Sequence, residues 1–183
     1  MMCYWQNNSK SIALSVWNVT PKDVMGYEKA VEWNGLIGAF GFIVTFSIAF
    51  YLAKSPKKHG AKMIHFACLL FGAISFLWFP TIQNQYVFFA VIIGYGIAWA
   101  SMMGIPYLMV VAVIPKERYG VYMGIINMMI VIPMIIQNLS FGYILKNFLD
   151  NDPRQAISFA GVLLMLAAIC TLLIKIKNTK VSE

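Results

Sequence analysis

Five long stretches of this 183-residue chain contain no aspartate, glutamate, lysine or arginine. They run from Trp33 to Ala53, Met63 to Pro80, Thr81 to Pro115, Tyr119 to Leu145 and Gln155 to Ile174. Each is long enough to cross a bilayer, for which a helix needs roughly 20 residues. Lipid admits only helices and closed barrels, and barrel strands would alternate in polarity over about ten residues. Because these stretches are almost continuously apolar, they predict an all-α, polytopic transmembrane helix bundle.

Composition and charge support the same class. Hydrophobic residues make up 60% of the chain and charged residues 11%, against about 25% charged residues in soluble domains. The net charge of +7 does not indicate a nucleic-acid partner, because the basic residues gather on alternate loops. One side of the predicted bundle carries nine basic residues: Lys54, Lys57, Lys58, Lys62, Lys116, Arg118, Lys175, Lys177 and Lys180. The other side carries four basic and five acidic residues: Lys22, Lys29, Lys146, Arg154, Asp23, Glu28, Glu32, Asp150 and Asp152.

The positive-inside rule assigns an orientation to this pattern, since cytoplasmic loops carry the excess of lysine and arginine. We therefore expect a multi-pass protein of the cell membrane, inner or plasma, whose carboxyl terminus is cytoplasmic. The lipid bilayer is its expected surrounding.

Residues typical of metal, cofactor or catalytic sites are scarce. Cys3, Cys68 and Cys170 are isolated, and neither His59 nor His65 has a second histidine or an acid at ligand spacing. The chain has no His-Glu-x-x-His, no Gly-x-Ser-x-Gly and no phosphate-binding loop. We expect no metal site, no cofactor and no enzymatic activity.

The first residues, 1–17, are typical of the end of a transmembrane helix, with Trp17 as an interfacial anchor. At 1.5 Å per residue they span roughly 24 Å, less than a bilayer core of about 30 Å, so we expect further turns upstream. A polar loop is expected from Asn18 to Glu32, with Pro21 and Gly26 as breakers. The predicted single domain, 1–183, then has one partial and five complete spans: 1–17, 33–53, 63–80, 85–114, 119–145 and 155–174.

The stretch from Gly94 to Ile136 resembles the tenth and eleventh helices of the sucrose and maltose proton symporters, within the major facilitator superfamily. The resemblance rests on three groups of residues: Gly96, Gly104 and Pro106; Gly120, Gly124 and Asn127; and Val131, Ile132 and Pro133. These glycines are interpreted as sites of close helix packing. Met134 departs from the pattern, since a glutamine is expected there in relatives, and Gln137 and Asn138 follow one turn later.

This resemblance implies the carboxyl-terminal half of a twelve-helix transporter. The expected partners are a sugar, protons and an amino-terminal six-helix half, which would supply most of the acidic residues that couple proton movement. The complete spans of this chain contain no carboxylate.

Polar and aromatic residues within the spans are the candidate substrate contacts, because polar groups in lipid usually face a bundle interior or a water-filled pathway. Gln6, Asn7 and Lys10 approach the bilayer midplane, where transporter sites form. The alternative is that this helix lies further out, with Lys10 reaching the headgroups. Tyr95 and Trp99 are one helical turn apart and offer either a flat wall for a sugar ring or simple packing.

Asn127, Gln137 and Asn138 complete the set of candidate substrate-binding residues. Asn127 is deep in an apolar helix, so we expect its amide to hydrogen-bond across the bundle, either to substrate or to another helix.

The leading hypothesis is a secondary transporter that moves a sugar or glycoside, coupled to protons, by alternating access. Two alternatives remain open at this point: a homodimeric half-transporter, and a non-transporting membrane receptor or assembly subunit.

Overall fold

The computed structural model describes residues 2–54, 60–111 and 114–174, and over these ranges the chain is all-α. The side chains of residues 2–6 and of Lys116 lie outside the described part. The helices are α1 (Met2–Ile12), α2 (Val24–Lys54), α4 (Ala61–Trp78), α5 (Phe88–Val111), α6 (Tyr119–Phe148) and α7 (Pro153–Leu173). A π-helical turn (Ala13–Trp17) continues α1, and 3-10 turns follow α4 (Phe79–Thr81) and precede α6 (Lys116–Arg118).

Five of these helices, α2 and α4 to α7, are long and apolar enough to cross a membrane. The described part of the chain is therefore a multi-pass helix bundle, which confirms the predicted fold class. Most observed helix ends lie within a few residues of the predicted spans.

The start of α2 differs most from the prediction, because residues 24–32 are helical instead of looped. Asp23 accounts for the early start. Its Oδ1 accepts a hydrogen bond from the Gly26 N–H at 3.3 Å, and its carbonyl accepts one from the Tyr27 N–H at 2.9 Å. An aspartate in this position satisfies backbone donors of the first turn. At 31 residues and about 46 Å, α2 exceeds the hydrocarbon thickness of about 30 Å, so its charged first turns can extend beyond the lipid.

The turn between α6 and α7 is tight and capped. Asp150 and Asn151 adopt positive φ angles of 49° and 55°, a region that aspartate and asparagine tolerate better than most residues. Asp152 then caps α7, since its Oδ1 accepts from the Arg154 N–H at 2.8 Å, and its carboxylate pairs with the Arg154 guanidinium at 2.8 Å. Burial alone would raise the pKa of Asp152, but the hydrogen bonds from Arg154 outweigh it and lower that pKa.

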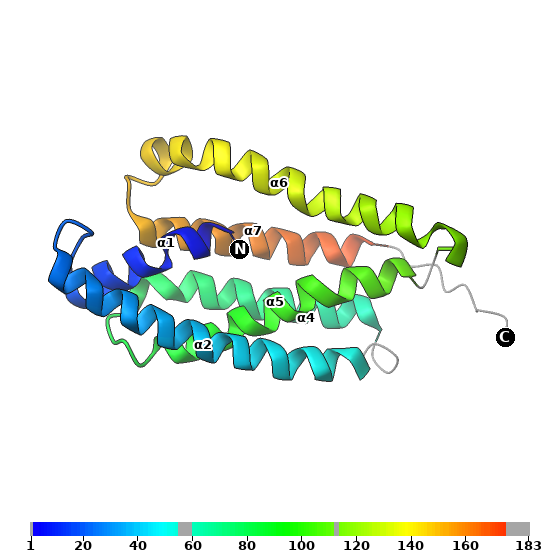
Figure 1. The fold of residues 1–183 in the computed structure, drawn as a ribbon, viewed down its shortest axis with the longest axis horizontal. Helices are drawn as coiled ribbons and strands as arrows, with labels where there is room; N and C mark the ends of the chain where they lie inside the picture. The colour runs from blue at the N-terminus through cyan, green and yellow to red at the C-terminus, as the bar shows by residue number, and fades with distance from the viewer. Residues whose placement is uncertain (1, 55–59, 112–113, 175–183) are drawn as a thin grey trace.

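Four helices, α2, α4, α5 and α7, form a closely packed block (Figure 1). Within the block, α4 packs against α5 and α7, α2 packs against α5, and α1 lies along α7. Its interior is aromatic and aliphatic: Phe76, Phe79, Phe88, Val91, Ile37 and Ile157 are all at most 2% exposed. We call this unit the block.

Glycines permit the close approach of helices in the block. A Cβ added to Gly94 would lie 2.8 Å from Ser75 Cβ and 2.9 Å from the Phe71 carbonyl oxygen. One added to Gly41 would lie 2.6 Å from Ile92 Cγ1, and one added to Gly96 would lie 2.9 Å from Val44 Cγ1. Only glycine leaves room for these contacts, so the packing role predicted for Gly96 is confirmed.

Helix α6 stands apart from the block (Figure 1). Phe141 is the one buried residue in its described length. The close packing predicted at Gly104, Gly120 and Gly124 does not occur within the described part of the chain, because a Cβ added at any of them would meet no described residue within 4 Å. On α6 the reason is the gap between this helix and the block, which side chains bridge only in places.

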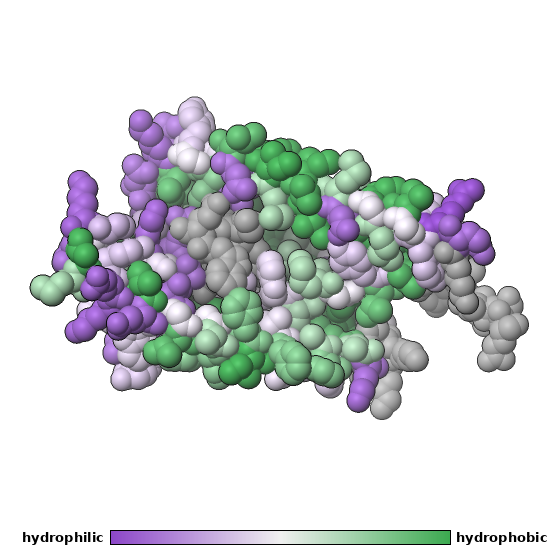
Figure 2. Space-filling model, in the orientation of Figure 1, coloured by the Kyte–Doolittle hydropathy of each residue, from purple (hydrophilic) through white to green (hydrophobic). Residues whose placement is uncertain are grey.

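Hydrophilic residues gather at the two ends of the bundle, and a largely hydrophobic band lies between them (Figure 2). Lys54, Lys62 and Arg118 belong to the end where α2 finishes and α4 begins, on the right in Figure 1. Asp23 and Asp152 belong to the opposite end. Other predicted members of the basic side, Lys57, Lys58, Lys175, Lys177 and Lys180, lie outside the described residues.

Candidate functional site

The space between α6 and the block forms a cavity of about 540 Å³, which we call the main cavity. It is walled by α5, α6 and α7. Its lining residues are Trp99, Met102, Met103, Met129, Ile130, Pro133, Met134, Gln137, Ala160, Leu163 and Leu164. The walls are apolar apart from the Gln137 amide and the Trp99 indole N–H, and four methionines supply flexible, polarizable surface.

A ladder of three aromatic rings leads from the block to this cavity. Phe76 and Tyr95 have ring centroids 6.0 Å apart at 24°, and Tyr95 and Trp99 have centroids 6.0 Å apart at 13°. Tyr95 and Trp99 therefore stack on one face of α5, as their spacing of one helical turn predicted. Tyr95 is only 2% exposed, however, so Trp99 alone presents its ring to the cavity.

Gln137 lies with Met134 in the cavity wall on α6. Relatives of the resembled family are expected to carry a glutamine at position 134. In this chain the amide of Gln137 lies about one helical turn further along α6. Its neighbour Asn138 lies on the exposed side of α6 and does not line the cavity. Of these two candidates, the structure brings only Gln137 together with Trp99.

Asn127 makes the predicted hydrogen bond across the bundle. Its Oδ1 accepts from the Tyr107 hydroxyl of α5 at 2.6 Å. In this structure its partner is another helix, and the bond holds α6 to α5.

The polar cluster predicted on α1 divides into two parts. Asn7 is buried at 5% exposure, with its carbonyl oxygen accepting from the Ser11 hydroxyl at 2.7 Å, whereas Lys10 is exposed. The side chain of Gln6 lies outside the described part. The residues that line the main cavity include neither Asn7 nor Lys10, so the cluster and the aromatic wall do not share that space.

A second, smaller cavity of about 290 Å³ lies beside the main one, and we call it the side cavity. The two share Met102, Met129, Ile130 and Leu164, so they adjoin along the seam between the block and α6. The rest of its lining is His65, Leu69, Pro106, Tyr107, Ile126, Ala167 and Thr171.

His65 and Ser101 are polar residues that the sequence reasoning did not select. His65 Nδ1 lies 2.7 Å from Ser101 Oγ, and Ser101 is fully buried. Each is a polar residue inside an apolar span, and this is the sequence signal that distinguishes them. Among the described residues, no group of three histidines, cysteines or carboxylates is placed to hold a metal ion.

Comparison with known proteins adds family information. The family model of the Major Facilitator Superfamily matches residues 2–138, from α1 into the second half of α6. Neither the curated proteins nor the solved structures gave a significant match.

Proposed function

Because this chain belongs to the major facilitator superfamily of membrane transporters, we propose that it moves a sugar or glycoside, coupled to protons, by alternating access. Its nearest type would be the sucrose and maltose symporters, and the chain would form their carboxyl-terminal half. Membership of this family supports a role in membrane transport.

The main cavity is the observation that carries the proposal. The Trp99 ring offers a flat apolar wall that suits the C–H face of a sugar ring. Gln137 can both donate to and accept from hydroxyl groups, and it lies in the same cavity. The four methionines suit an apolar aglycone. This combination favours a glycoside with an apolar substituent over a small, fully polar solute.

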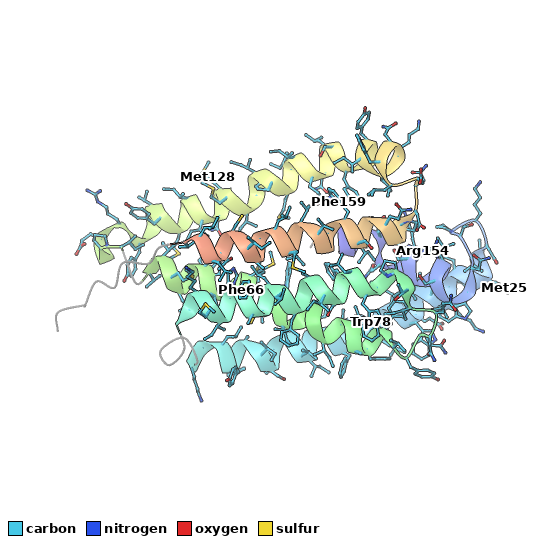
Figure 3. All side chains as sticks on the ribbon, turned by 180° about the vertical axis from the view of Figure 1, so that it is seen from behind. Met25, Phe66, Trp78, Met128, Arg154 and Phe159 are labelled. Atoms are coloured by element: carbon cyan, nitrogen blue, oxygen red, sulfur yellow. The ribbon has the colours of Figure 1, made fainter. Side chains whose placement is uncertain are left out.

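The proposed partner is an amino-terminal six-helix half docked against α6. Gly120 and Gly124 form a Gly-x-x-x-Gly pattern, the small-residue spacing at which transmembrane helices approach closely. No described residue lies within 4 Å of a Cβ added to either glycine, and Met128 on the same helix is 59% exposed (Figure 3). Mass measurement in mild detergent tests the partner: a complex with a second polypeptide supports it, and a homodimer would favour the half-transporter alternative.

The proposed orientation follows the charges at the two ends of the bundle. The end with Lys54, Lys62 and Arg118 would be cytoplasmic by the positive-inside rule. Helix α7 finishes at that same end, which supports a cytoplasmic carboxyl terminus, and the membrane would be the cell membrane.

Transport by the full assembly in proteoliposomes tests the proposed function. Trp99→Ala should lower the initial uptake of a labelled glycoside by at least tenfold, since removal of a stacking wall costs at least about 1.4 kcal/mol of binding. Trp78→Ala is the matched control, because Trp78 on α4 is 49% exposed (Figure 3) and does not line the main cavity. Equal uptake by the two variants, or no uptake of any mono- or disaccharide or glycoside, would refute the proposal.

A further inference from the structure

His65 is the one histidine in the five charge-free stretches of the chain. It lies on the second turn of α4, near the end that also carries Lys54 and Arg118. Histidine is the side chain whose ordinary titration range includes neutral pH. In a chain whose complete spans contain no carboxylate, His65 is thus the residue best suited to take up a proton reversibly.

The surroundings of His65 form a hydrogen-bonded relay. Its Nδ1 lies 2.7 Å from Ser101 Oγ, and the Cys68 thiol is close enough to the same serine to exchange a hydrogen bond with it. Ser101 is 0% exposed and Cys68 7% exposed, so both partners of the histidine are buried. The histidine itself also lines the side cavity, which at about 290 Å³ is large enough to hold several water molecules.

His65 Nδ1 and the Ser101 hydroxyl each have a hydrogen-bond partner whether the imidazole ring is neutral or protonated. In the neutral state the Ser101 hydroxyl donates to Nδ1, the Cys68 thiol donates to Ser101 Oγ, and the ring carries its proton on Nε2. Addition of one proton makes both ring nitrogens donors. Nδ1–H then donates to Ser101 Oγ, and the Ser101 hydroxyl turns to donate to Cys68 Sγ.

We propose that His65, Ser101 and Cys68 form a proton-binding site that opens to the side cavity. A hydronium ion in the water of that cavity gives up its proton and becomes a neutral water molecule, and Nδ1 of the imidazole ends protonated, so that the ring carries a single positive charge. The inference rests on the proposed proton-coupled transport and deepens it, because the side cavity adjoins the main cavity through shared residues.

Among the described residues, no charged side chain lines the side cavity beside His65. On α4 the titratable residues within one turn of it are Cys68 and Lys62, and the Lys62 Nζ is already bound to the carbonyl oxygens of Leu172 and Ile174 at 2.6 and 2.7 Å. On α5 the Tyr107 phenol lines the cavity, and the described residues of α6 and α7 in the lining supply nothing titratable. Without a counter-charge in the lining, the charged ring relies on Ser101 and on water for stabilisation, and removal of that water disfavours the charged form.

The test is a pH titration of the ring by nuclear magnetic resonance. The full chain carrying His59→Gln is labelled with ¹³C,¹⁵N-histidine and reconstituted in lipid nanodiscs, so that every signal comes from His65. We expect a reversible change from the Nε2–H tautomer to the doubly protonated ring as the pH falls. Ser101→Ala should shift the midpoint and abolish the tautomer preference, and Cys68→Ala should shift the midpoint alone.

Ser47→Ala is the matched control, since the Ser47 hydroxyl donates at 2.9 Å to its own helix at the Ile43 carbonyl and is exposed. It should leave the titration of His65 unchanged. Ring signals that stay constant at every pH where the chain remains folded would overturn the inference. An unchanged titration in both Ser101→Ala and Cys68→Ala would overturn it as well. Sugar uptake is not part of this measurement, so a failed sugar assay would refute the proposed function and leave the proton site standing.

Discussion

The block and α6 have similar apolar compositions but opposite packing. In the block, glycines bring helices so close that a single added Cβ would collide with a neighbour, as at Gly94 and Gly41. Along α6, an added Cβ at Gly120, Gly124 or Gly142 would meet no atom of the described residues within 4 Å. Hydropathy alone gives no hint of this contrast, because both regions are long enough and apolar enough to span a membrane.

This difference in packing suits the block to a role in stability and α6 to a role in function. The block has the interlocked interior of a rigid scaffold. Helix α6 is held by the Tyr107–Asn127 hydrogen bond, by Phe141 and by its short connection to α7. Both cavities lie where α6 faces the block, so the loosely held helix contributes to the walls that a transporter must move.

The strongest test of the contrast substitutes glycine by alanine in each region. Gly94→Ala should lower the free energy of unfolding by about 3 kcal/mol, because the new methyl group meets Ser75 Cβ and the Phe71 carbonyl. Gly142→Ala on α6 should be neutral or stabilise by up to about 1 kcal/mol through helix propensity. Unfolding in mixed micelles, followed by circular dichroism, measures both. Similar losses in the two variants would show that α6 is packed as tightly as the block.

A smaller effect is expected at the turn that joins α6 to the block. Asp152→Ala should cost about 1 kcal/mol, because it removes the cap of α7. The folded-state pKa of Asp152 lies below its ordinary value, about 3.9. Its carboxylate therefore contributes stability that is complete above about pH 4 and is lost as the pH falls through the lowered pKa.

Asp152→Asn is the control for this cap, since asparagine caps helices as well as aspartate does. It should keep most of the stability at neutral pH and lose the acid dependence. Acid unfolding curves of the three proteins measure the difference, and a wild-type curve parallel to that of Asp152→Asn below pH 4 would contradict the assignment.

The smallest effect is expected for the hydrogen bond that holds α6. Tyr107→Phe should destabilise the protein by only about 0.6 kcal/mol, the average for such bonds within membranes, yet it should raise hydrogen exchange along α6. Thr45→Val is the control, because Thr45 bonds to the Gly41 carbonyl at 2.9 Å inside the block. Mass spectrometry of deuterium uptake distinguishes them. If α6 exchanges equally in both variants, the Tyr107–Asn127 bond is not what holds it.

Part of the candidate site was predictable from local spacing. Tyr95 and Trp99 stack because residues one turn apart share a helix face. Asn127 was expected to bond across the bundle for the same kind of local reason, since a polar amide in lipid needs a partner. The burial of Tyr95, the exposure of Lys10 and the absence of Asn138 from the cavity wall were not predictable, because each depends on which neighbour covers the residue.

The sequence by itself determined the class of the protein and the number of its long spans, because hydropathy and the bilayer thickness act on each segment separately. Tertiary structure decided which helices interlock, which glycines are covered and which side chains face the two cavities. Helices such as α5 and α6 are apolar on every side, so their own residues specify no inward face. Only contact with the neighbouring helices selects one.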